Sequence, residues 1–137
     1  MRPLEERNSC PEASILVVDD VSAWRVQVRK ILENQPELQI VAEACNGLQA
    51  IQRSSELNPS LVLLDIGMPV LNGIEAAKKI QRISPQSKIV FLTQESDSDI
   101  RSEALDSGAQ AYVLKSNAAS ELLPTIRGFL SNGHRVH

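Results

Sequence analysis

A chain of 137 residues is long enough to form one domain with an apolar core that needs neither disulfides nor a structural metal. Its only aromatic residues are one Trp, one Tyr and two Phe, so aliphatic side chains must build that core. Because 14 basic residues stand against 17 acidic ones and no segment carries a basic run, we expect no nucleic-acid binding through this chain itself.

The cysteines and the chain ends indicate the cellular compartment of the protein. Cys10 and Cys45 have no partners at metal-ligand spacing, which is typical of free thiols in a reducing compartment, so we expect a cytoplasmic protein. The start of the chain is charged and contains proline, unlike a signal peptide, and no segment is apolar enough to suit a membrane. We expect a flexible lead at 1–13, one domain at 14–132 and a tail at 133–137.

Apolar segments of two kinds alternate along the chain. Short apolar runs followed by turn residues predict strands at 15–18, 61–64, 88–92 and 111–114. A less regular alternation predicts a further strand, nearer the sheet edge, at 38–44. Apolar residues at helical spacing follow each strand, at 24–32, 50–57, 74–83, 100–105 and 122–130. This order predicts an α/β fold, in which a parallel sheet is covered by helices on both faces.

Several residues are expected to begin or end these helices. Ser22 is placed to cap the first helix and Asn72 to cap the third. Pro124 conflicts with a helix interior, so either Ser120 caps a late start of the last helix or the helix bends near the proline. That helix is expected to stop at Asn132 and the glycine after it.

Polar residues stand where four of the predicted strands end. Asp19 and Asp20 follow the first strand, Asp65 the third, Thr93 the fourth and Lys115 the fifth. Each alone has a simple structural explanation, and an aspartate directly after a strand is most often a turn residue. Because the carboxyl ends of parallel strands meet at one edge of the sheet, we expect all of them around one crevice.

Trp24 leaves two interpretations open. It lies one turn beyond Asp20, which would suit a residue of the site. Its place on the apolar stripe of the first helix favours packing in the core instead.

The expected crevice has a specific chemistry. Three crowded carboxylates repel one another and raise each other's pKa unless a cation lies among them. Oxygen ligands without His or Cys suit Mg2+ or Mn2+, and Mg2+ in proteins commonly also binds a phosphate oxygen. A carboxylate can accept a phosphoryl group as a nucleophile, while an ammonium and a hydroxyl stabilise its oxygens.

With these residues in place, the sequence resembles the receiver domain of bacterial two-component response regulators. The resemblance covers about 14–132 and rests on five motifs in order: Val17-Val18-Asp19-Asp20, Leu63-Leu64-Asp65-Ile66-Gly67-Met68-Pro69 with Asn72-Gly73, Phe91-Leu92-Thr93, Gly108-Ala109 and Tyr112-Val113-Leu114-Lys115. It implies a flavodoxin-like (βα)5 fold, doubly wound around a five-stranded parallel sheet with strand order 2-1-3-4-5.

The resemblance also implies roles for the residues of the crevice. Asp65 would accept a phosphoryl group from a phosphohistidine on a sensor histidine kinase or a phosphotransfer protein. Asp20, Asp65 and the backbone carbonyl of Gly67 would hold Mg2+ (or Mn2+), with Asp19 helping directly or through water. The chain would then catalyse only its own phosphorylation and dephosphorylation, and would otherwise not be an enzyme.

Other residues would bind the phosphoryl group and change conformation in response to it. Thr93 and Lys115 would bind its oxygens. Thr93 would move toward it, and the ring of Tyr112 would turn inward behind, which remodels the surface around the fourth helix and the fifth strand. The thin apolar stripe of that helix suits an element with two states.

Details of the sequence resemble one subfamily, in which a LuxR-type helix-turn-helix output domain follows the receiver. These are Lys115-Ser116, the segment 43–47 and the residues before Lys115. Transcription would be the output, and DNA would be bound only through that further domain, so the chain is either excised from a longer regulator or stands alone. A homodimer is possible.

Many receivers have proline after the lysine, on a cis bond, so the geometry of the Lys115-Ser116 bond is open in this chain.

Gln94 departs from the usual small residue beside the site. It would either hinder access to Asp65 or swing into solvent.

Two other functions fit part of the pattern. A metal-dependent phosphatase with an aspartate nucleophile usually has a second Asp two residues later, where this chain has Gly67. An adaptor that is never phosphorylated would not need all of the polar strand-end residues, and this chain has them all.

Overall fold

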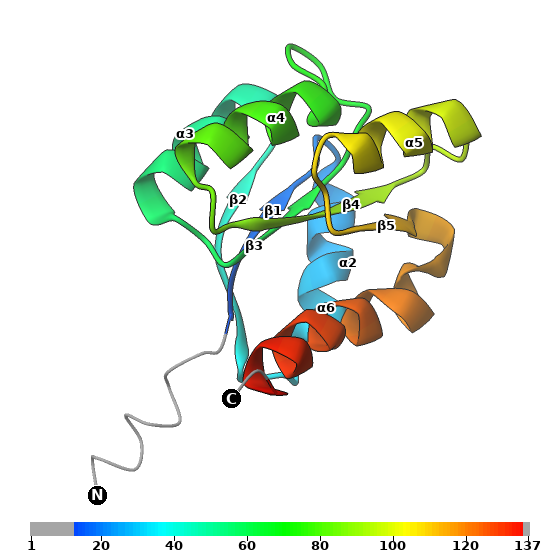
Figure 1. The fold of residues 1–137 in the computed structure, drawn as a ribbon. Coiled ribbons are helices and arrows are strands. Elements are labelled where there is room, and N and C mark those ends of the chain that lie inside the picture. Colours follow the sequence, from blue (N-terminus) through cyan, green and yellow to red (C-terminus); the bar gives the residue numbers. More distant parts are fainter. Residues whose placement is uncertain (1–12, 136–137) are drawn as a thin grey trace, which may run out of the picture.

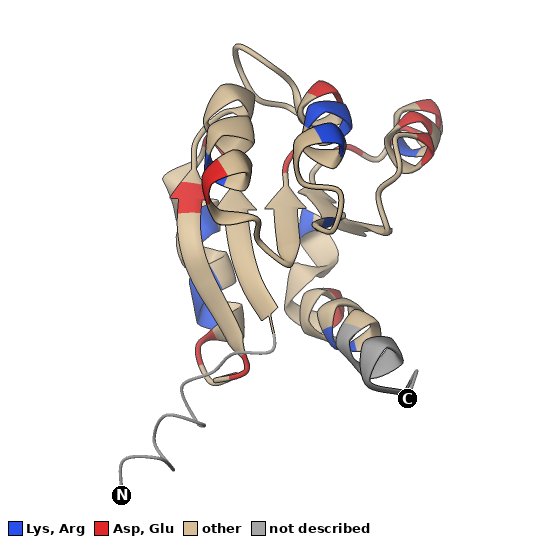
Figure 2. Ribbon diagram, turned by 60° about the vertical axis from the view of Figure 1, so that its left-hand side comes forward, with Lys and Arg blue, Asp and Glu red and all other residues tan. Residues whose placement is uncertain are grey.

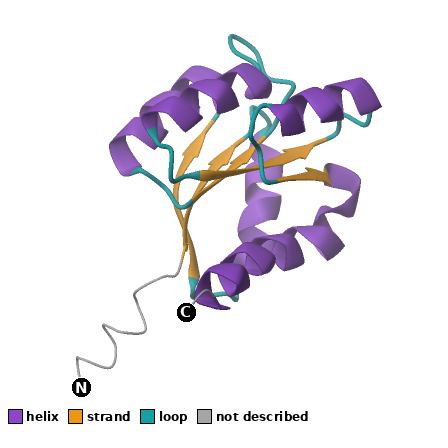
Figure 3. Cartoon of the chain, in the orientation of Figure 1, coloured by secondary structure: helices purple, strands orange, loops and turns teal. Residues whose placement is uncertain are grey.

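A computed structural model describes residues 13–135, and these form a five-stranded sheet in which every neighbouring pair of strands is parallel. The strands are β1 (Ala13–Val18), β2 (Leu38–Ala44), β3 (Leu61–Leu64), β4 (Lys88–Thr93) and β5 (Ala111–Leu114). Their order across the sheet is β2-β1-β3-β4-β5, which confirms the predicted fold class and the predicted edge position of β2. Figure 3 shows the strands between two layers of helix.

The helices are α2 (Ser22–Leu32), α3 (Gly47–Leu57), α4 (Gly73–Ile83), α5 (Ser98–Asp106) and α6 (Ala118–Arg135). Figure 1 shows α3, α4 and α5 on one face of the sheet and α2 with α6 on the other. The crossovers therefore cover both faces, as expected for a parallel sheet. Figure 2 shows that charged residues lie mainly on the helices and at strand ends, while most of the sheet carries none.

Each face of the sheet has its own apolar core, because successive side chains of a strand point to opposite faces. In β1, Leu16 and Val18 contribute to the core under α3, α4 and α5. Ile15 and Val17 contribute to the core under α2 and α6. All four side chains of β3 are buried, which confirms the prediction of a strand covered on both sides.

One predicted cap is confirmed and one is wrong. The side chain of Asn72 accepts a hydrogen bond from the amide of Glu75 at 3.0 Å, as an N-terminal cap of α4. Ser22 is instead the first residue of α2, and Val21 before it offers no side-chain cap. The amide of Val21 donates to the carboxylate of Asp19 at 2.9 Å, so an upstream acidic residue stabilises this turn.

The last helix differs from its predicted bounds. A 3-10 turn at Lys115–Asn117 leads directly into α6, so the late start is wrong, and the hydroxyl of Ser120 donates to the carbonyl of Asn117 instead of capping the helix. Pro124 lies inside the helix, where it removes one backbone hydrogen bond. The predicted stop at Asn132 and Gly133 is also wrong, because a glycine costs only about 1 kcal/mol in a helix.

The predictions for the two chain ends lie mostly outside the described residues, which exclude 1–12 and 136–137. Over the range that is described, β1 starts at Ala13 and helical structure reaches Arg135. Within the same range, none of the helices is both long enough and apolar enough to cross a membrane.

The loop after β3 is packed tightly against the start of α4. The amide of Gly73 donates to the carbonyl of Ile66 at 2.9 Å, and a Cβ at Gly73 would lie 1.9 Å from the carbonyl oxygen of Asp65. Only glycine fits there without moving the backbone. A Cβ at Gly67, in the same loop, would meet no atom within 4 Å.

We therefore expect Gly73→Ala to lower the free energy of unfolding by about 2 kcal/mol, as for other overpacked sites. Gly67→Ala is the matched control, with an expected change within about 0.5 kcal/mol. Urea unfolding followed by circular dichroism measures both. Equal stability of the two variants would contradict the close contact at Gly73.

Candidate functional site

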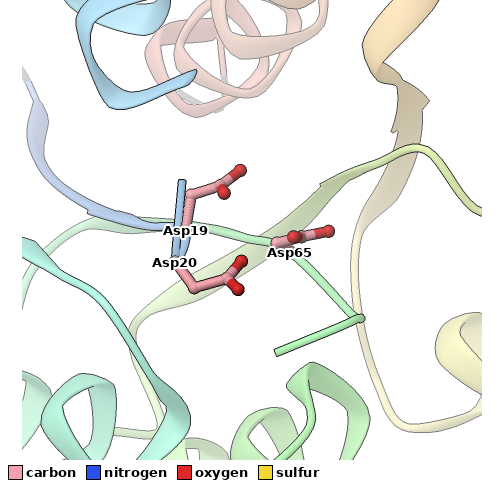
Figure 4. Close-up of side chains that lie close together, drawn as sticks. All are labelled: Asp19, Asp20 and Asp65. Atoms are coloured by element: carbon pink, nitrogen blue, oxygen red, sulfur yellow. The ribbon is translucent and has the colours of Figure 1, made fainter. Parts of the chain in front are cut away.

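The predicted carboxylates converge at the carboxyl ends of two neighbouring strands. Asp19 and Asp20 follow β1, and Asp65 follows β3, which pairs with β1. One carboxylate oxygen from each of the three lies within 4.8 Å of the others. Figure 4 shows their side chains pointing to the same side of the chain. Asp19 and Asp65 are buried, whereas Asp20 is exposed.

Lys115 brings a cation to these carboxylates from the end of β5. Its Nζ lies 2.7 Å from Oδ2 of Asp19 and 3.4 Å from Oδ2 of Asp65. The side chain of Lys115 is only 4% exposed, so these two carboxylates, and not water, stabilise its ammonium group. No peptide bond in the described residues is cis, so the Lys115-Ser116 bond is trans.

The backbone around Asp65 holds its side chain in place. The amide of Asp65 donates to the carbonyl of Val18 at 3.1 Å, which continues the ladder between β3 and β1. Oδ1 of Asp65 accepts a hydrogen bond from the amide of Ile66 at 2.8 Å. Oδ2 is left facing Lys115, so one oxygen is committed to the loop and the other to the site.

Burial raises the pKa of the Asp65 carboxyl above its ordinary value, because removal from water disfavours the charged form. The ammonium of Lys115 opposes this increase, and the nearby carboxylate of Asp19 adds to it. The hydroxyl of Thr93 and the amide of Ile66 also lower the pKa, but the net direction remains upward. Three carboxylates stand against one ammonium in this cluster, so the site has more acidic groups than its own cation balances.

A cleft of about 300 Å³ opens over these groups. It is lined by Asp20, Val21, Asp65, Gly67, Thr93, Gln94, Glu95 and Lys115. Gln94 is exposed to solvent and also lines the cleft, so its effect on access to Asp65 stays a prediction. A larger groove of about 750 Å³ between α2 and β2 contains none of the predicted site residues.

Tyr112 does not line the cleft and is connected to it through a loop. Its hydroxyl donates to the backbone carbonyl of Glu95 at 2.5 Å, and the amide of Glu95 lies 3.3 Å from the hydroxyl oxygen of Thr93. The ring packs against Phe91, and the guanidinium carbon of Arg101 lies 5.3 Å from the ring centroid. Burial raises the pKa of the Tyr112 hydroxyl. The aromatic ring is thus two contacts away from Thr93.

Two residues of α2 belong to the site in ways that its periodicity did not predict. Trp24 packs against the core under α2 and α6, and its ring centroid also lies 5.0 Å from Nζ of Lys115. The two interpretations of Trp24 therefore both hold. Arg25 donates to the backbone carbonyl of Asp19 at 2.5 Å. No sequence signal indicates this contact, because its partner is a backbone atom.

Comparison with known proteins gives a consistent result. A family model described as "Response regulator receiver domain" matches residues 15–127. Transcriptional regulatory protein LnrK of Bacillus subtilis is 37% identical over 119 residues, which cover 87% of this chain and 54% of that protein. The chain thus spans about half the length of this relative.

Solved structures agree with this result. The response regulator domain of Thermotoga maritima CheB has a TM-score of 0.79 and 33% identity, covering 86% of this chain and 96% of that one. A LuxR-family two-component response regulator from Aurantimonas sp. has a TM-score of 0.82 and 32% identity, covering 88% and 86%.

From the raised pKa of Asp65 we predict how the free energy of unfolding depends on pH. The folded protein binds the Asp65 proton more tightly than the unfolded chain, so the free energy of unfolding falls as pH rises from 3.8 through the folded pKa. Asp65→Asn removes this loss, while Lys115 keeps Asp19 as its partner at 2.7 Å. In the absence of metal, we expect the variant to be more stable than the parent at pH 7, with a smaller difference near pH 3.

Urea unfolding in EDTA at several pH values measures this difference. Asp20→Asn is the control, because its exposed carboxylate should give a smaller gain. A stabilisation by Asp65→Asn that grows toward low pH would contradict the assignment.

Proposed function

Because the chain belongs to the response regulator receiver domain family of two-component signalling, we propose that Asp65 accepts a phosphoryl group from a histidine kinase or a phosphotransfer protein. The observation that carries this proposal is the cluster of carboxylates within 4.8 Å of one another, with Lys115 bound between the two buried members. Such a cluster is electrostatically costly, and it suits a site that binds a cation together with a phosphoryl group.

The donor set fits a hard divalent cation. Carboxylate oxygens of Asp20 and Asp65 and the carbonyl of Gly67, with Asp19 directly or through water, would hold Mg2+ (or Mn2+). When bound, the ion neutralises negative charge on the carboxylates and on the transferred phosphoryl oxygens. No nitrogen or sulfur ligand belongs to the described cluster, so the donors favour these ions over zinc.

The transfer itself needs one nucleophile and two stabilising groups. A carboxylate oxygen of Asp65 attacks phosphorus, a P–O bond forms, and the P–N bond of the phosphohistidine breaks with its electron pair left on the imidazole nitrogen. Lys115 binds one oxygen of the transferred group through its ammonium. Thr93, buried at the end of β4, donates its hydroxyl to another.

A short series of contacts would transmit the presence of the phosphoryl group from the cleft to the surface. Thr93, Glu95 and Tyr112 form consecutive contacts from the cleft to β5. The neighbouring helix α5 buries only Ala104, so few contacts hold it in one arrangement. We propose that phosphorylation remodels this surface of α5 and β5, the fourth helix and fifth strand of the sequence.

The output is proposed from the relatives. Because the relatives include transcriptional regulators and the chain covers about half of their length, we propose a transcriptional output through a separate DNA-binding domain. In this role the chain is a signalling domain that catalyses only its own phosphorylation and dephosphorylation. A cytoplasmic location and a homodimer belong to the same proposal.

Beryllofluoride, which mimics a phosphoryl group on aspartate, tests the acceptor. With Mg2+ present it should change the fluorescence of Trp24, because the ring lies 5.0 Å from the ammonium that would bind the mimic. Asp65→Asn should abolish the change. Asp106→Asn, an exposed carboxylate of α5, should retain it.

A folded parent protein that shows no change in fluorescence or amide spectra would count against a phosphoacceptor. Steady release of phosphate from added monoesters over many turnovers would instead indicate a phosphatase.

A further inference from the structure

Arg25 reaches from the first turns of α2 to the acidic turn after β1. Its Nη1 donates to the backbone carbonyl of Asp19 at 2.5 Å, and its Nε donates to Oε1 of Glu43 at 3.0 Å. The side chain of Arg25 is 19% exposed, so most of it is withdrawn from water. A mostly buried guanidinium with two directed hydrogen bonds is held in one orientation.

The edge strand β2 completes this contact. The amide of Asp19 donates to the carbonyl of Ala44 at 3.0 Å, and Glu43 is the residue before Ala44. The amide and the carbonyl of Asp19 are therefore both tied to β2, one directly and one through Arg25. Because a peptide group is planar, fixing the Asp19 carbonyl also fixes the plane from which Asp20 begins.

Asp20 depends on that plane for its direction. Its side chain is exposed, and no hydrogen bond to its carboxylate comes from the described part of the chain. Asp19, in contrast, has its own side-chain partners in Val21 and Lys115. Among the carboxylates of the site, Asp20 is thus the one whose position relies most on the backbone.

Glu43 keeps Arg25 in place and balances its charge. Burial alone would raise the pKa of Glu43, but hydrogen bonds and charge from Arg29 and Arg25 bring it below its ordinary value. Glu43 therefore stays ionised near neutral pH. Since the positive charge of Arg25 is paired, its contribution at a cation site comes mainly from geometry.

We infer that Arg25, anchored by Glu43, is a positioning residue that holds the Asp19-Asp20 turn in the conformation that binds the divalent cation. The inference rests on the proposed function, because the ion is the Mg2+ of that site. In metal sites, groups that orient the ligands typically change metal affinity by about 10 to 100-fold when removed.

Arg29 provides a matched control. It lies one turn further along α2 and pairs with the same carboxylate of Glu43, but among the described residues it makes no hydrogen bond or ion pair with Asp19. Arg29→Met and Arg25→Met therefore remove the same charge from the same helix, and only the second removes the bond to the Asp19 carbonyl.

Isothermal titration calorimetry with Mg2+ alone, on the whole chain, measures the affinity, and urea unfolding in EDTA measures the stability of each variant. We expect Arg25→Met to weaken Mg2+ binding by about ten-fold and Arg29→Met to change it by less than about two-fold. Arg25→Lys keeps the charge but lacks the fork that binds two partners, so its affinity should fall between those of Arg25→Met and the parent.

The outcomes separate the two proposals. A parent protein that binds no Mg2+ overturns the proposed function and this inference together. A parent that binds Mg2+, with equal affinities for Arg25→Met and Arg29→Met, overturns only the role of Arg25. If Arg25→Met does not fold, parental affinity in a folded Arg25→Lys overturns it as well, because a purely structural arginine would change stability without changing metal affinity.

Discussion

The contact of Lys115 with two buried carboxylates is the interaction on which the site depends. Asp19 and Asp65 stand at the ends of neighbouring strands, and both are removed from water. Without a cation between them, their repulsion would oppose the packing of β1 against β3. The parallel sheet makes this contact possible because it brings the end of β5 to the same edge. The fold and the site are therefore linked through one ammonium group, which balances part of the negative charge of the carboxylates.

The parts of this arrangement that follow from short-range pattern could be predicted from the sequence. Apolar runs gave the strands, and polar residues directly after them gave the convergence of Asp19, Asp20, Asp65, Thr93 and Lys115 at one cleft. The cap at Asn72 was predictable because its partner is only three residues away. The roles assigned to these residues in phosphorylation and metal binding stay predictions, because they follow from the resemblance to a family and not from position alone.

The features that sequence reasoning missed depend on distant partners or on competing local energies. Arg25 binds a carbonyl oxygen, and any residue in place of Asp19 would offer one. Trp24 meets Lys115 only because α2 crosses the end of the sheet, so its helical spacing revealed the core role and not the second contact. At α6, the helix continues through Gly133, whose helix cost is only about 1 kcal/mol, and it retains Pro124 in its interior.

The burial of the charged site has a consequence for its response to ionic strength. Asp19, Asp65 and Lys115 are each under one-tenth exposed, so dissolved ions screen their interactions weakly. The exposed pairs Arg53–Glu56 and Lys78–Glu75 lie in water, where charges are screened beyond about 10 Å at 0.1 M salt. Added salt therefore weakens the exposed pairs on the helices, while the contacts of Lys115 with Asp19 and Asp65 inside the cleft are largely preserved.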